Sequence, residues 1–88
     1  MRLSKEKRDK IAEKILSFLY HEFPKSFFTA EIAKSEARDE EFIKTLMFEL
    51  KQKNLVTNIK QNPKGIFYSR RIRWKLSNQA HEAYKQHI

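Results

Sequence analysis

The sequence predicts an α+β fold that is mainly α: a three-helix core with a short strand, a C-terminal two-stranded hairpin and a short terminal helix. Apolar residues recur at three- and four-residue steps through the first half of the chain, which is the period of buried helix faces. From Leu55 the pattern alternates with period two, and the turn-forming stretch Asn-Pro-Lys-Gly at 62–65 interrupts it. With 88 residues, of which 40% are hydrophobic, we expect one small domain over residues 1–88.

The first helix is expected over residues 4–22. Ser4 is a suitable N-cap, because its hydroxyl can accept a hydrogen bond from the first helical turn. Two adjacent lines of apolar residues follow at helical spacing, one with Ile11, Ile15 and Phe18, the other with Ala12, Leu16, Leu19 and Phe23. Pro24 then ends the helix.

A helix-turn-helix is expected next. Phe27 and Phe28 predict a short strand, and Thr29 is the expected N-cap of a helix over residues 29–36. Asp39 is the expected N-cap of a third helix over residues 39–53, and Asn54 suits the left-handed residue that follows many helices. The apolar positions of the third helix are Phe42, Ile43, Leu46, Met47 and Leu50. Two helices joined by so short a turn are typical of a helix-turn-helix.

A hairpin over residues 55–76 and a terminal helix over residues 78–87 complete the prediction. In the second strand, one face is expected to support the core: Ile66, Tyr68, Ile72, Trp74 and Leu76. The opposite face carries Phe67, Ser69, Arg71, Arg73 and Lys75. Ser77 or Asn78 can cap the terminal helix.

Charge is concentrated in one quarter of the chain. Lys and Arg minus Asp and Glu gives 7 − 4 = +3 for residues 1–28, 3 − 6 = −3 for 29–50, 8 − 0 = +8 for 51–75 and 1 − 1 = 0 for the rest. The basic, acid-free quarter coincides with the predicted hairpin. Such a surface favours an anionic partner, because like charges without counter-charges create a positive potential.

Specific residues resemble a known family. The run Glu31-Ile32-Ala33, followed by Leu50-Lys51-Gln52-Lys53-Asn54-Leu55-Val56, resembles the "Leu-Ala … Leu-x-x-x-Gly-Leu-Val" frame of winged helix-turn-helix regulators. Trp74-Lys75-Leu76-Ser77 is similar to the strand that returns from their wing. The resemblance covers roughly residues 5–85. The chain departs from the frame at Asn54, which replaces Gly, and at Ala37 and Arg38, which replace a Gly and an apolar residue in the turn.

The resemblance implies binding of double-stranded DNA, with the third helix in the major groove and the wing on the adjacent backbone or minor groove. Family positions that face DNA correspond to Asp39, Glu40, Glu41, Lys44, Thr45 and Phe48. Carboxylates oppose phosphates, although they can accept a hydrogen bond from cytosine. The candidate DNA contacts are Arg38, Lys44, Thr45, Lys60, Lys64, Arg70, Arg71, Arg73 and Lys75.

Two functional classes stay open at this point. The acid-free wing favours a DNA-binding transcription regulator, whereas the acidic third helix favours a protein-interaction module; RNA binding through the same basic face is a further alternative. A homodimer is expected if the terminal helices pair through Ile11, Ile15, Phe18, Tyr84 and Ile88. The same residues can instead close the core of a monomer.

Several other functions are not expected. The chain has no Cys and one Gly, and His21, His81 and His87 are scattered, so we predict no metal site, no phosphate-cradling loop, no cofactor and no enzymatic activity. No small-molecule substrate site is apparent. No apolar run approaches the roughly 20 residues of a membrane helix. We therefore expect no membrane partner and a cytoplasmic, nucleoid-associated location.

Overall fold

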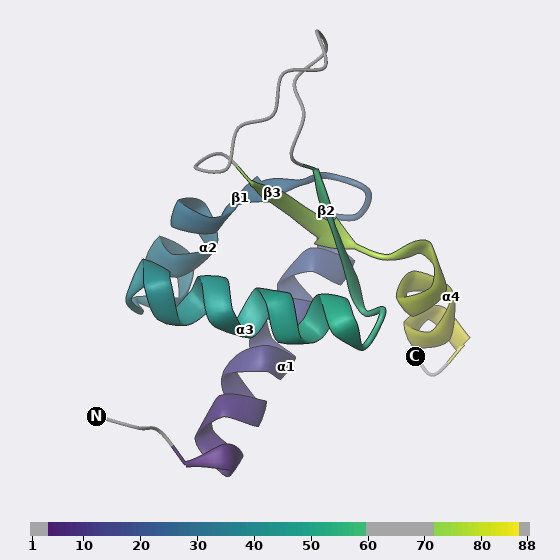
Figure 1. Ribbon diagram of the computed structural model, residues 1–88. Coiled ribbons are helices and arrows are strands. Elements are labelled where there is room, and N and C mark those ends of the chain that lie inside the picture. Colours follow the sequence, from purple (N-terminus) through teal and green to yellow (C-terminus); the bar gives the residue numbers. More distant parts are fainter. Residues whose placement is uncertain (1–3, 60–71, 87–88) are drawn as a thin grey trace, which may run out of the picture.

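Four helices and a small antiparallel sheet form the structure (Figure 1). The computed structural model describes residues 4–59 and 72–86. Its elements are α1 (Lys5–His21), β1 (Phe27–Phe28), α2 (Thr29–Glu36), α3 (Glu40–Gln52), β2 (Val56–Ile59), β3 (Arg73–Leu76) and α4 (Asn78–Gln86). The predicted α+β, mainly helical fold is confirmed. No helix within these residues is long and apolar enough to cross a membrane.

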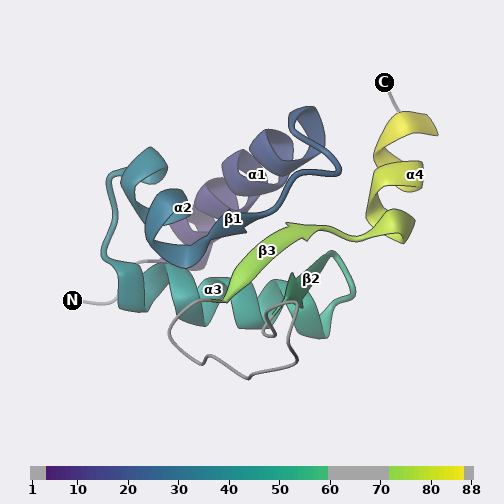
Figure 2. The ribbon, with the colours of Figure 1, turned by 90° about the horizontal axis from the view of Figure 1, so that it is seen from above.

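The central strand of the sheet is β3, which pairs with β1 on one side and β2 on the other. All pairs are antiparallel, and Trp74 lies opposite Phe27 on one neighbour and Asn58 on the other. Figures 1 and 2 show α1 and α3 beneath one face of the sheet, with α4 beyond the far end of β3. Trp74 and Leu76 are fully buried against these helices. The predicted alternation therefore holds over residues 72–76, whereas residues 66–71 lie outside the described part of the chain.

Side-chain caps fix the ends of three helices. Ser4 Oγ accepts a hydrogen bond from the Lys7 N–H at 3.2 Å, and Asp39 Oδ2 accepts one from the Phe42 N–H at 3.1 Å. Ser77 Oγ accepts from the Ala80 N–H at 3.0 Å. These three caps are confirmed, and each satisfies a backbone donor that has no partner inside its helix.

The predicted N-cap of α2 was wrong. The cap is Phe28, and Thr29 is the first helical residue. The Thr29 hydroxyl instead accepts a buried hydrogen bond from Trp74 Nε1 at 2.8 Å, because an indole N–H removed from water needs an acceptor. Glu31 Oε1 accepts from the Phe28 N–H at 2.8 Å and so satisfies the backbone of the cap residue.

One hydrophobic core is shared by α1, α2, α3, β2, β3 and α4. Its members are Ile11, Ala12, Ile15, Leu16, Leu19, Ile32, Ala33, Ile43, Leu46, Met47, Leu50, Val56, Ile72, Trp74, Leu76 and Ala80. Ile11 and Ile15 were also candidates for a dimer surface, but they are 6% and 0% exposed. They close the core of the monomer, so they are not available for a contact with a second copy.

Among the described residues, Ala37 and Asn54 adopt the left-handed conformation at helix ends. Ala37 has φ 54° and Asn54 has φ 62°. Asn tolerates this region well, and its position after α3 confirms the prediction. Ala37 closes α2, where the Arg38 N–H donates to the Ala33 carbonyl at 2.9 Å. An Ala in this conformation brings its Cβ close to the following carbonyl, which glycine avoids.

Aromatic stacking attaches α4 to the rest of the domain. The His81 ring lies 4.0 Å from the Phe23 ring and 5.2 Å from the Tyr20 ring, stacked on both. The Lys75 ammonium of β3 lies 5.2 Å from the centroid of the same Phe23 ring. Tyr84 also contacts Tyr20, and burial, with a smaller effect of the Glu13 carboxylate, raises the pKa of its phenol. Ala80 is the one residue of α4 that is fully buried.

Replacing Ala37 by Gly is expected to stabilise the domain by roughly 0.5–1 kcal/mol, because glycine adopts the left-handed conformation without a Cβ clash. In thermal unfolding, this corresponds to a rise of roughly 2–8 °C in the midpoint. Ala30→Gly, in the first turn of the same helix, is the matched control and is expected to lower the midpoint. A lower midpoint for Ala37→Gly would contradict the assigned backbone conformation.

Replacing Thr29 by Val is expected to destabilise the domain by about 1–3 kcal/mol, since the buried Trp74 N–H would lose its acceptor while the side-chain shape is kept. Thr29→Ser retains the hydroxyl and is expected to lose less. Urea unfolding followed by Trp74 fluorescence measures both free energies. Equal losses for the two variants would show that the hydrogen bond is not the stabilising contact.

Candidate nucleic-acid interface

Helix α3 presents a polar face away from the core. Its buried side is Ile43, Leu46, Met47 and Leu50. The opposite side carries the exposed residues Glu41, Thr45 and Gln52 with the half-buried Lys44 beside them. The spacing of four and three residues places these side chains on one line along the helix. This is the face that a helix-turn-helix would offer to a groove.

Lys44 and Thr45 are the candidate contacts of α3, and each offers a specific hydrogen-bonding group. The Thr45 hydroxyl donates to the Glu41 carbonyl at 3.1 Å, so its oxygen lone pairs remain as acceptors. An acceptor suits the exocyclic amino group of adenine or cytosine. Lys44 contributes donors only.

Phe48 does not match its expected position. The half-buried ring packs edge-on against Trp74, with centroids 5.2 Å apart and planes at 89°. It supports the contact between α3 and the sheet, so we assign it to packing. The exposed Asp39, Glu40 and Glu41 occupy the cap and first turn, where carboxylates stabilise the helix dipole.

Arg38 is exposed in the turn between α2 and α3. Its backbone is held by the hydrogen bond to Ala33, and its side chain forms no ion pair within the described residues. The turn therefore places one unpaired cation beside the acidic start of α3.

The outward face of the sheet carries the remaining described candidates. Cross-strand pairing places five residues on this face, and we call them the outward sheet face: Phe28, Thr57, Ile59, Arg73 and Lys75. Arg73 and Lys75 have no ion-pair partner within the described part of the chain. They point away from α3, because Trp74 between them points toward it. The polar face of α3 and these two cations thus lie on different sides of the sheet.

The other predicted contacts, Lys60, Lys64, Arg70 and Arg71, lie outside the described residues, as do Phe67 and Tyr68. Ile88 of the expected dimer surface also lies outside them. Phe18 and Tyr84 are half-buried at the edge of the core.

The arrangement of helices and strands is shared with known structures. No protein-family model and no curated protein sequence matches the chain. Solved structures match it well. A mutant of Lactococcus lactis ZitR in its apo form has a TM-score of 0.69 at 20% identity, over 93% of this chain and 57% of that chain. Staphylococcus aureus MepR has a TM-score of 0.62 at 18% identity, over 92% of this chain and 64% of that chain.

The chain has a winged helix-turn-helix fold. The fold expected from the resemblance is thereby confirmed, with α2 and α3 as the helix-turn-helix and β2 and β3 as the base of the wing. The S. aureus MepR–DNA complex also matches, with a TM-score of 0.62 at 21% identity over 93% of this chain and 73% of that chain. The chain spans only a little over half the length of the ZitR chain, at 57%.

ZitR is described as a zinc-responsive MarR family member, and MepR as a transcription regulator of the multidrug efflux pump MepA. In this winged helix, no three His, Asp or Glu side chains among residues 4–59 and 72–86 gather where a metal ion would bind. Sequence identity near 20% supports the shared fold and does not carry those responses over to this chain.

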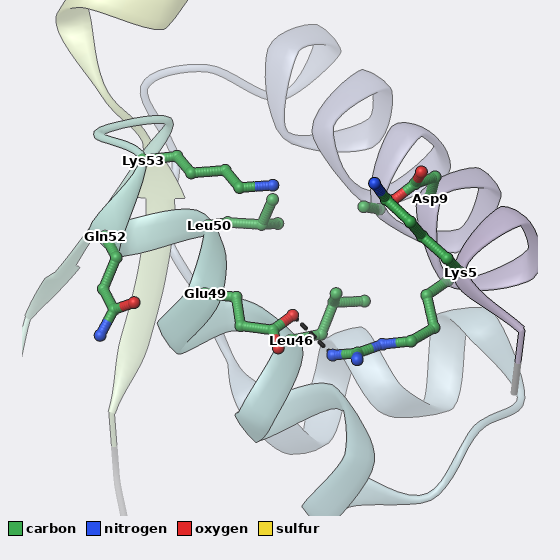
Figure 3. Close-up of a pocket in the computed structure, with 9 residues that line it drawn as sticks. Lys5, Asp9, Leu46, Glu49, Leu50, Gln52 and Lys53 are labelled. Carbon is green, nitrogen blue, oxygen red and sulfur yellow. Dashed lines mark hydrogen bonds and ion pairs between the residues drawn. The ribbon is translucent and has the colours of Figure 1, made fainter. Parts of the chain in front are cut away.

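A groove that the sequence did not predict lies between α1 and α3 (Figure 3). Its volume is about 620 Å³, and its lining is Lys5, Arg8, Asp9, Ala12, Leu46, Glu49, Leu50, Gln52 and Lys53. Arg8 Nη2 donates to Glu49 Oε2 at 2.6 Å across the groove. Both side chains are partly exposed, at 34% and 45%. Arg8 Nε is buried and has no hydrogen-bond partner within the described residues. The pair spans 41 positions of sequence, so no local signal could have found it.

The Arg8 and Glu49 pair is expected to contribute at most about 1 kcal/mol to stability, because solvent screens partly exposed charges. Glu49→Gln should therefore lower the free energy of unfolding slightly at low salt, and the loss should shrink in about 1 M salt. Glu82→Gln, an exposed change of the same charge on α4, is the control. A loss that persists unchanged at high salt would indicate packing instead of ion pairing.

Proposed function

We propose that this winged helix is a DNA-binding transcription regulator of the cytoplasm and nucleoid. In the proposed mode, α3 enters the major groove and the wing contacts the flanking backbone or minor groove. The observation that carries the proposal is a helix-turn-helix with a polar outer face, followed by a hairpin whose Arg73 and Lys75, on the opposite side of the sheet, have no acidic partner among the described residues.

Electrostatics supports this mode of docking. The acid-free stretch 51–75 carries the formal excess of +8, and phosphate neutralisation supplies most of the affinity of non-specific DNA binding. Arg73 offers a flat, forked donor that suits phosphate oxygens, whereas Lys75 acts as a point charge. Lys44 and the acceptor oxygen of Thr45 would then read base edges, and Arg38 would contact the backbone at the start of α3.

The structural relatives also support a DNA-binding role in regulation. One of the matching structures is a MepR–DNA complex, and MepR is named as a transcription regulator. DNA binding is thus compatible with this arrangement of helices and wing, and the relatives named with a role act in regulation instead of catalysis.

A protein-interaction role is the second candidate, because Asp39, Glu40 and Glu41 are all exposed at the start of α3. Three carboxylates there repel phosphates and suit a basic partner surface. Pairing of two copies through half-buried residues such as Phe18 and Tyr84 remains part of the proposal, since regulators that bind two half-sites are commonly two-fold symmetric.

Salt titration of binding to random duplex DNA tests the proposal. With about six phosphates neutralised, the slope of log affinity against log salt is expected to be on the order of −5. Replacing Arg73 and Lys75 together by Gln should flatten the slope by about two, because each phosphate contact contributes about 0.9.

The matched control removes the same charge from α1, where Lys10 and Lys14 are exposed. Replacing both by Gln should change the slope by less than about one, since neither lies on α3 or the wing. Equal flattening by the two double variants would mean that net charge acts without a defined site. Absence of salt-sensitive binding by the wild type would refute DNA binding and favour the protein-interaction role.

A further inference from the structure

Phe28 is a partly exposed aromatic residue at the edge of the sheet. The residue is 37% exposed, which is more than any other large hydrophobic residue in the described part of the chain. The other phenylalanines of the described part are half-buried against the core. Phe28 belongs to β1 and lies at the end of the sheet beside α2.

Its place at the N-cap of α2 is also unfavourable for the helix. N-cap positions favour Ser, Thr, Asp and Asn, because their side chains accept hydrogen bonds from the first turn. A phenyl ring cannot accept such a bond. The hydroxyl of the next residue, Thr29, accepts a hydrogen bond from Trp74 Nε1 instead. A residue that breaks a local rule is a candidate for function.

The neighbours of Phe28 provide positive charge and hydrogen-bonding groups. Arg73 lies directly opposite Phe28 in the sheet, and its guanidinium carbon is 5.8 Å from the ring centroid. That distance is near the outer limit of a cation–π contact, so Arg73 covers the ring loosely. Lys75 follows two residues along the same face, opposite the exposed Thr57.

We propose that the outward sheet face binds single-stranded nucleic acid. An unpaired base stacks on the Phe28 ring, where the Arg73 guanidinium adds a second planar group. Lys75 and Arg73 attract the flanking phosphates. The Thr57 hydroxyl, opposite Lys75, is a hydrogen-bonding group on the same face. Aromatic rings on a sheet surface flanked by cations are suited to unpaired bases, because every base has a π-face to stack.

The chemistry of the face favours this partner over a protein. Its described part is five side chains on three short strands, which suit contacts with one or two nucleotides. The face has no carboxylate, and its cations are unpaired among the described residues. A base-paired duplex cannot use it in the same way, since its bases are stacked on one another. Single-strand binding by this face is therefore distinct from duplex binding by α3.

Phe28→Ser is the decisive variant, because it removes the ring and introduces a favourable N-cap. Because Phe28 is only 37% exposed, the lost burial offsets the gain from the cap, and unchanged binding of the abasic and duplex probes described below shows that the variant is folded. Fluorescence anisotropy with a labelled oligothymidine strand of about 12 nucleotides should show roughly tenfold weaker binding than the wild type. Phe28→Tyr retains a stacking ring and should bind within about twofold of the wild type.

An abasic strand of the same length and charge separates stacking from electrostatics. Wild type and Phe28→Ser are expected to bind it equally, and both should bind a duplex of matched charge equally. The proposal is overturned if the wild type does not bind oligothymidine, or if Phe28→Ser binds it as the wild type does. Equal weakening toward the thymidine, abasic and duplex probes would also overturn it.

A labelled polyglutamate peptide that binds in a Phe28-dependent manner, without oligothymidine binding, would identify an acidic protein as the partner instead. Duplex binding by the wild type tests the proposed regulator function separately, so the two can fail independently.

Discussion

The buried hydrogen bond from Trp74 to Thr29 is the contact on which the rest of the arrangement depends. Trp74 is fully buried at the centre of the sheet, and the bond fixes β3 against the first turn of α2. Because strand side chains alternate, burial of Trp74 forces Arg73 and Lys75 onto the outward face. The same bond occupies the hydroxyl of Thr29, the first helical residue, and Phe28, with extended backbone, is the N-cap residue before it. The position of Trp74 thus fixes the face on which the two cations and their cross-strand neighbour Phe28 lie.

Most of the fold could be predicted from the sequence because its signals are local. The helix expected over 39–53 is α3, Glu40–Gln52, and its buried residues are those that the periodicity selected. Asp39 has a carboxylate within reach of the first turn, and Asn54 tolerates the left-handed conformation. Period-two alternation around Trp74 likewise predicted the core face of β3. Each of these patterns is decided within a few residues of the chain.

The features that the sequence did not predict depend on contacts between distant segments. Nothing near Thr29 shows that an indole 45 positions away takes its hydroxyl. Periodicity identified Ile15 as part of an apolar helix face, but it could not show which residues pack against that face. In the structure, the face packs into the core of the same monomer. The resemblance placed Phe48 on the DNA side, whereas the edge-on contact with Trp74 gives it a packing role. For the candidate interface, sequence therefore identified the charges, and the sheet register determined the direction in which they point.

The Phe23 ring connects the terminal helix α4 to Lys75 on the outward sheet face. It stacks on His81 of α4 and also receives the Lys75 ammonium of β3. A phosphate that drew Lys75 away would remove a contact of about 0.5–1 kcal/mol, which is the usual strength of a cation–π interaction near solvent. Any coupling between α4 docking and phosphate binding through this ring would be reciprocal and would not exceed that contact, roughly two- to fivefold in affinity. Through one shared ring, α4 would then act as a weak modulator of the sheet surface, with an influence limited to that single contact.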